Sequence, residues 1–157
     1  RAAARVCRTD PNVVFVFSGS GDMERWLVEE SARLGLADKV IFAGFLRGEQ
    51  LNRLYRMADI YVMPSVSEPF GITSLEALAN GAPILISRQS GVAEMVSHCL
   101  KVDFWDVDQI AGKILAATRY AELRQTLQEN GANEVKKFSW VESAKLCLGV
   151  YRQALTA

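Results

Sequence analysis

The chain has 157 residues, half of them hydrophobic and 23% charged, which predicts a folded domain with a substantial core and disfavours disorder. Eighteen basic residues balance eighteen acidic ones, so no general attraction to nucleic acid or to acidic membranes is expected. Cys7, Cys99 and Cys147 are odd in number and widely spaced, which indicates buried thiols in a reducing compartment rather than disulfides or a zinc site. No apolar run approaches the ~20 residues that a membrane span needs.

The first residues, Arg1 to Cys7, are typical of a helix that is already under way. We therefore expect residues 1–157 to be a single α/β domain cut from a longer protein. Short runs rich in β-branched and aromatic side chains then alternate with apolar residues at helical spacing. Met23, Leu27 and Leu34 are expected on the buried side of the first intervening helix. Strands are predicted at residues 13–17, 39–43, 59–63, 82–86 and 100–102.

These strands are nearly continuous apolar runs, which is typical of parallel strands covered by helices on both faces. The repeated strand–helix order predicts a Rossmann-like, doubly wound parallel sheet, a fold of the α/β class. The last third of the chain is helical in pattern. Asp106 is expected to start one helix, and Ser139 to Glu142 match a capping box at the start of another.

The segment from Met63 to Glu94 carries the chemistry. A strand ends at Met63, a loop follows, and a helix opens near Gly71, which is where ligands bind in an open α/β sheet. Gly71 lets the backbone approach a ligand closely, and the unpaired amides of Gly71, Ile72 and Thr73 point toward any anion placed there. Together with the Thr73 hydroxyl, these amides predict a cradle for a diphosphate.

Two carboxylates flank this predicted cradle. Glu68 lies in the loop before the helix and Glu76 lies one to two turns inside it, so both reach one pocket from different heights. Carboxylates are good acceptors for sugar and ribose hydroxyls. A phosphate cradle between two such carboxylates indicates a site for a nucleotide sugar.

The same segment resembles a known family. Glu68-Pro69-Phe70-Gly71 followed by Glu76 is similar to the E-x7-E motif of GT-B-fold retaining glycosyltransferases, the glycosyltransferase family 4 and glycogen-synthase-like group. The resemblance covers the chain from residue 11 to about residue 154. The flanking patterns that agree are a G-x-G loop at 18–21, LEAMA-like residues at 75–79, G-x-P at 81–83 and G-x-x-E at 91–94.

The resemblance implies the donor-binding domain of a retaining glycosyltransferase, which binds a nucleotide-diphosphate sugar for transfer of the glycosyl group to an acceptor hydroxyl. It implies that Glu68 is catalytic and contacts the donor sugar, and that Glu76 contacts the ribose. It implies neither a metal nor another cofactor, because the helix dipole and basic side chains neutralise the leaving diphosphate. The other implied contacts are made mainly by backbone: Phe70, Gly71, Ile72 and Thr73 at the sugar and diphosphate, Phe45 and Leu46 beside the base, and Gly19 in the G-x-G loop.

The chain departs from the family pattern at its start. The family's donor half opens with a strand bearing G-R and a later K-G, whose basic side chains clamp the diphosphate, and Arg5, Arg8 and Arg88 are not at matching positions. Because that strand is central to the family's sheet, we expect the C-terminal half of a GT-B fold lacking its first strand. The sheet should be interrupted unless strands shift or another chain fills the gap. The expected partner is an N-terminal acceptor domain of the same polypeptide.

Other interpretations stay open. Without the motif, Glu76 is an ordinary solvated residue and Glu68 a loop carboxylate. Gly19 serves equally well in a tight turn, and His98 is expected at a helix end rather than in catalysis. The alternative functions are a non-catalytic α/β module for binding or oligomerisation, and a GT-B-fold nucleotide-sugar epimerase, which the E-P-F-G-x-x-x-L-E-A pattern disfavours. The expected location is the cytoplasm, with a peripheral position at the inner membrane face left open.

Overall fold

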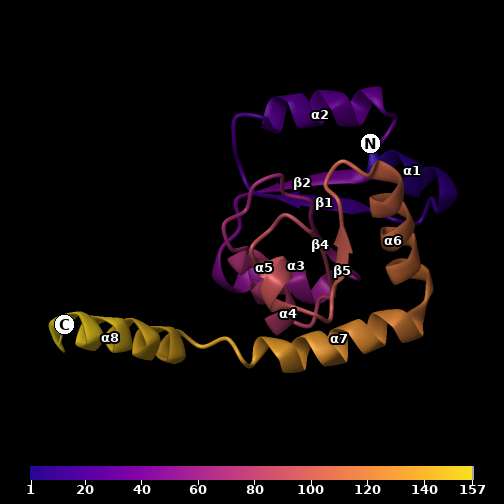
Figure 1. Ribbon diagram of the computed structural model, residues 1–157. Coiled ribbons are helices and arrows are strands. Elements are labelled where there is room, and N and C mark those ends of the chain that lie inside the picture. The colour runs from indigo at the N-terminus through magenta and orange to yellow at the C-terminus, as the bar shows by residue number, and fades with distance from the viewer. Residues whose placement is uncertain (157) are drawn as a thin grey trace.

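The computed structural model describes residues 1–156 and shows strands and helices in alternation (Figure 1). The strands are short and parallel within each sheet. The α/β class predicted from the alternating pattern is therefore confirmed. In chain order the elements are α1 (Ala2–Thr9), β1 (Phe15–Ser18), α2 (Glu24–Arg33), β2 (Val40–Gly44), α3 (Gly48–Met57), β3 (Tyr61–Met63), α4 (Ile72–Ala79), β4 (Ile84–Ser87), α5 (Val92–Met95), β5 (Leu100–Val102), α6 (Val107–Arg119), α7 (Ala121–Val135) and α8 (Trp140–Thr156).

The strands form two sheets rather than one. β1 pairs with β2, with Phe15 opposite Val40, and β3, β4 and β5 form a second sheet in that order. In that second sheet Leu85 of β4 lies opposite Val62 on one side and Leu100 on the other. Within residues 1–156 no strand joins β1 to β3, which agrees with the interrupted sheet expected from the resemblance.

The predicted strands are found, but four of the five begin one or two residues later than predicted. The first residues of two predicted runs still complete the preceding turn. The amide of Val13 donates to the Asp10 carbonyl (3.4 Å), and the amide of Ala82 donates to the Ala77 carbonyl (2.9 Å). Strand pairing can begin only after the residues that make these hydrogen bonds, and the apolar pattern of the sequence does not reveal such bonds.

Side chains alternate along β4 into two core layers. Ile84 and Ile86 pack against α3, α4 and α5, whereas Leu85 packs against α1 and α6. Helices therefore cover both faces of the three-stranded sheet, as the doubly wound prediction requires. The layer of α3, α4 and α5 includes the helix on which Ile72, Thr73 and Glu76 lie.

Two helices, α2 and α8, stand apart from these core layers in Figure 1. Among the described residues, neither helix buries any of its own side chains, and Met23 at the start of α2 is 60% exposed. The predicted burial of Met23 is therefore wrong. The physical reason is the narrow two-stranded sheet beside α2, where Val16 and Ile41 themselves remain exposed. Cys147 of α8 is exposed as well, contrary to the expectation that the thiols are buried.

The helix starts predicted in the last third are confirmed in part. The Asp106 carboxylate accepts a hydrogen bond from an amide in the first turn of α6 (2.9 Å), so it caps that helix. At the start of α8 the Ser139 hydroxyl accepts from the Val141 amide (3.2 Å). Glu142 pairs with Lys145 at 2.6 Å instead of reaching back to Ser139, so the capping box is only half formed. The Lys145 ammonium, one turn further along the helix, binds the Glu142 carboxylate more strongly than the Ser139 amide would.

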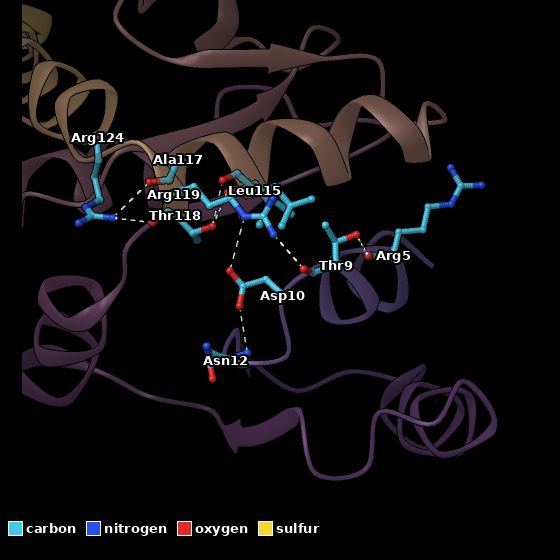
Figure 2. A network of polar contacts seen from close by, with 10 residues as sticks. Arg5, Thr9, Asp10, Asn12, Leu115, Ala117, Thr118, Arg119 and Arg124 are labelled. Carbon is cyan, nitrogen blue, oxygen red and sulfur yellow. Dashed lines mark hydrogen bonds and ion pairs between the residues drawn. The ribbon is translucent and has the colours of Figure 1, made fainter.

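A polar network ties α1 to the end of α6 (Figure 2). The Arg119 guanidinium donates to the Thr9 carbonyl (2.8 Å) and lies 3.7 Å from the Asp10 carboxylate. Asp10 in turn accepts from the amide of Asn12 (3.1 Å), which fixes the turn that leads toward β1. Arg124 binds the last carbonyls of α6 in the same region.

Replacing Arg119 with alanine is expected to lower the free energy of unfolding by about 1 kcal/mol, because the Thr9 carbonyl and Asp10 lose a charged partner at a half-exposed position. Urea unfolding measures this loss. Arg25→Ala is the matched control, since Arg25 pairs with Glu29 on the exposed surface of α2 and should change stability far less. Equal losses in the two variants would show that the network does not attach α1.

Candidate functional site

The site is built on the connection between β3 and α4. β3 ends at Met63, and α4 begins at Ile72 with Gly71 as its N-cap. Gly71 has φ of 103° and ψ of 50°, in the left-handed region that side chains disfavour. A Cβ at this position would lie 3.0 Å from Met63 Cε and 3.0 Å from Val92 Cγ1. Both the backbone conformation and the lack of room therefore require glycine.

The first turn of α4 begins at a buried glycine and continues with two exposed residues, Ile72 and Thr73. In the part of the chain that the structure describes, no side chain caps this helix start. The amides of Ile72 and Thr73 lie in the first turn, where the helix supplies no carbonyl partner. Both residues are exposed, so an anion can reach these amides and the positive end of the helix dipole.

The hydroxyl of Thr73 is held by the protein itself. It accepts a hydrogen bond from the Tyr61 hydroxyl (2.9 Å) and lies 3.7 Å from the Met63 sulfur. The Ser74 hydroxyl donates to the same sulfur at 3.4 Å. The amide of Thr73, rather than its hydroxyl, is therefore the group that this conformation offers to a ligand.

The loop that carries Glu68 is fixed by the start of α5. The Gly91 amide donates to the Glu68 carbonyl (3.0 Å), and the Val92 amide donates to the Phe70 carbonyl (2.6 Å). A Cβ on Gly91 would lie 2.2 Å from the Pro69 carbonyl oxygen, far inside contact distance. The segment that resembles the G-x-x-E pattern is thus the backbone support of this loop.

The charges of Glu68 and Glu76 both affect the pKa of the Tyr61 phenol. Burial raises the pKa of Tyr61, its hydrogen bond to Thr73 opposes the rise, and the charges of Glu68 and Glu76 add to it. Glu68 is half-buried and accepts a long hydrogen bond from the Phe70 amide (3.4 Å), whereas Glu76 is exposed. Both carboxylates therefore contribute to the raised pKa of Tyr61, although each has its own hydrogen-bond donor, Phe70 for Glu68 and Tyr55 for Glu76.

A second group of candidate residues lies where β1 and β2 end. Gly19 has φ of 134°, and its amide donates to the carbonyl at the end of β2 (2.8 Å). Phe45 is 61% exposed, with the Arg47 guanidinium carbon 4.7 Å from its ring centroid, and Leu46 is half-buried. Among residues 1–156, no hydrogen bond or ion pair joins this group to the Glu68–Glu76 segment. The structure thus shows two separate clusters of candidate residues.

Two tyrosines that the sequence analysis did not select belong to the site. The Tyr55 hydroxyl donates to Glu76 Oε2 at 3.4 Å, and its ring packs edge to face on that of Tyr61, with centroids 5.6 Å apart. In the sequence both occupy apolar positions of a helix and a strand. Only their hydroxyls distinguish them from packing residues, and the apolar pattern carries no signal for these.

Arg88 and His98 have partners away from this site. Arg88 Nε lies 4.0 Å from the Asp103 carboxylate, and His98 Nδ1 lies 3.1 Å from Glu134 Oε2. Residues 1–156 contain no cluster of three His, Cys, Asp or Glu side chains arranged to hold a metal ion. None of the helices described has the length together with the apolar character that crossing a membrane demands.

The sequence profile of the family described as Glycosyl transferases group 1 matches residues 1–134, a stretch that includes Glu68 and Glu76. The chain belongs to this family. An uncharacterized glycosyltransferase of Methanocaldococcus jannaschii is 37% identical over 149 residues, which cover 92% of this chain and 38% of that protein. The resemblance inferred from the sequence motifs is therefore confirmed.

Solved structures agree on the fold of this family member. Sucrose-phosphate synthase from Thermosynechococcus elongatus superposes with a TM-score of 0.86 at 26% identity, over 99% of this chain and 42% of that one. Anabaena HepE in complex with UDP-glucose gives 0.85 at 20% identity, over 97% and 44%. The predicted Rossmann-like C-terminal half of a GT-B fold is confirmed. The chain spans less than half the length of each of these relatives.

Proposed function

We propose that this chain is the donor-binding part of a retaining glycosyltransferase and that it binds a nucleotide-diphosphate sugar. The observation that carries the proposal is the start of α4, where a helix N-terminus without a side-chain cap follows Gly71 between Glu68 and Glu76. Membership of the family supports glycosyl transfer. HepE, which shares the fold, was solved with UDP-glucose, a donor of the proposed class.

In the proposed complex the amides of residues 70–73 bind the sugar and the diphosphate. Glu68 is the catalytic carboxylate at the sugar hydroxyls, and Glu76 accepts from the ribose. Phe45 and Leu46 flank the base, with the Gly19 loop beside them. The carboxyl ends of both sheets then face a single donor molecule, which would unite the two clusters of candidate residues.

The proposed reaction breaks the bond between the anomeric carbon and the diphosphate oxygen. A bond to the acceptor hydroxyl forms on the same face of the sugar, and the acceptor proton passes to the leaving phosphate. The amides and dipole of α4 stabilise the charge on that diphosphate, and the proposal needs no metal or other cofactor. We place the acceptor site in an N-terminal domain of the same polypeptide, and the reaction in the cytoplasm or at the inner membrane face.

Ligand-observed NMR with UDP-, ADP- and GDP-glucose tests donor binding by this chain. One of the three is expected to bind. Glu76→Ala should weaken it about tenfold or more, because charge-assisted hydrogen bonds to ribose are lost. Glu122→Ala is the matched control, since Glu122 is an exposed glutamate in the first turn of α7. Absence of binding, or equal binding by both variants, would contradict the proposal.

The chain alone is expected to transfer no sugar, because it spans 38% of its archaeal relative and the proposal assigns the acceptor site to the remainder. Incubation with the bound donor and a panel of sugar and polyol acceptors, followed by mass spectrometry, checks this. A glycosylated product that depends on Glu68 would show that the acceptor site lies within this chain.

A further inference from the structure

Tyr55 joins α3 to the functional face of α4. Its side chain is 5% exposed, and its hydroxyl donates to Oε2 of Glu76, which lies 21 positions further along the chain. Burial, with the neighbouring Tyr61 and Glu76, raises the pKa of Tyr55 far above neutrality. The phenol is therefore protonated at neutral pH and can donate to the carboxylate. Because it engages Oε2, Oε1 is left for a ligand hydroxyl.

Tyr61 performs the equivalent task one turn earlier in α4. Its hydroxyl donates to Thr73 Oγ1 at 2.9 Å, a normal hydrogen-bond distance. The edge-to-face contact of the two rings, at an interplanar angle of 80°, couples Tyr61 to Tyr55. The contact of Tyr55 with Glu76 is longer, at 3.4 Å, and such contacts in ligand-free sites tighten when the ligand binds.

We propose that Tyr55 and Tyr61 are positioning residues for the donor: Tyr55 orients the Glu76 carboxylate toward the ribose hydroxyls, and Tyr61 fixes the first turn of α4 through Thr73. This inference rests on the proposed function. A glutamate has three side-chain torsions, and holding them before the ligand arrives removes an entropic cost of binding. A first turn tied to β3 keeps the phosphate-facing amides in place for the same reason.

Phenylalanine at each position removes the hydroxyl and keeps the packed ring, so Tyr55→Phe and Tyr61→Phe separate positioning from core packing. The probes are UDP, ADP and GDP, each with its 2′-deoxyribose counterpart, and the readout is the dissociation constant by calorimetry. Tyr120→Phe is the matched control, because Tyr120 is 62% exposed at the N-cap of α7. Thermal unfolding of each variant verifies that it is folded.

The unsubstituted chain is expected to bind the ribose form of one diphosphate more tightly than its deoxy form. Tyr55→Phe should weaken the ribose form about 3- to 10-fold and the deoxy form less, because the deoxy form has lost one of the hydroxyls that Glu76 accepts from, so the preference for ribose shrinks. Tyr61→Phe should weaken both forms alike, and Tyr120→Phe neither.

Tyr55→Phe on a Glu76→Ala background should cause no further loss, because the hydroxyl acts through that carboxylate. A preference for ribose that Tyr55→Phe leaves undiminished, in a chain that binds the diphosphate, would overturn this inference alone. Failure of the unsubstituted chain to bind any of the probes would overturn the proposed function and the inference together.

Discussion

Gly91→Ala is expected to abolish measurable donor binding and to lower the free energy of unfolding by about 1–3 kcal/mol. The added Cβ would lie 2.2 Å from the Pro69 carbonyl oxygen and 3.2 Å from Phe70 Cα, both backbone atoms that cannot rotate away. The loop must shift, and the hydrogen bonds that the Gly91 and Val92 amides donate to it are then lost. Because that loop carries Glu68 and leads into Gly71, the whole binding face moves with it.

The matched control for this substitution is Gly112→Ala. Gly112 lies inside α6, and a Cβ there meets no atom within 4 Å in the part of the chain described. Alanine should therefore stabilise the helix by up to about 1 kcal/mol and leave donor binding unchanged. Calorimetric titration and urea unfolding of the two variants make the comparison. Normal donor binding by Gly91→Ala would refute the role assigned to the α5 start.

Glu134→Ala is expected to lower the free energy of unfolding by about 1–3 kcal/mol, because it removes the acceptor shared by two backbone amides and the His98 ring. Glu134 is 6% exposed, and its carboxylate accepts from the Ser97 amide (3.0 Å), from the His98 amide (2.9 Å) and from the His98 ring at 3.1 Å. These bonds hold α7 to the segment between α5 and β5. Glu129→Ala, on the exposed side of the same helix, is the control and should have little effect.

Acidification should reproduce part of this loss. Burial opposes ionisation of Glu134, but the amides of His98 and Ser97 outweigh it, so the pKa lies below its ordinary value of 4.5. The native carboxylate therefore stabilises the fold at pH values above its unfolded pKa, and this stabilisation is lost as the pH falls through the folded pKa. Urea unfolding at pH 7 and at pH 3 should show that the unsubstituted chain and Glu134→Ala differ less in their free energy of unfolding at pH 3. A Glu134→Ala loss that stays constant with pH would contradict this account.

The sequence was sufficient to predict the strands and the start of the helix that follows Gly71. The uninterrupted apolar run at the fourth strand indicated burial on both faces, and Ile84, Leu85 and Ile86 are fully buried. The glycine before the helix start was identified as a place where the backbone can approach a ligand closely. The structure adds that Gly71 has φ of 103°, a conformation that glycine adopts readily. Such features depend on residues that are adjacent in the sequence, so the local pattern reveals them.

What could not be predicted depends on contacts between distant segments. An apolar stripe shows which side of α2 would be buried, but not whether the neighbouring sheet is wide enough to cover it. The two tyrosine hydroxyls of the site find partners 12 and 21 positions away, and only the packing of α3 on α4 and β3 decides this. The buried Glu134, 36 positions from its partner His98, is another such case.

Backbone amide spectra of the ¹⁵N-labelled chain during titration with UDP, ADP and GDP test the central claim most directly. The account predicts that one diphosphate shifts the amides of Gly71, Ile72 and Thr73 together, in a saturable way, and that Glu76→Ala weakens the effect. Saturable binding that leaves these three amides unmoved and shifts others would contradict it, because the diphosphate would then lie elsewhere.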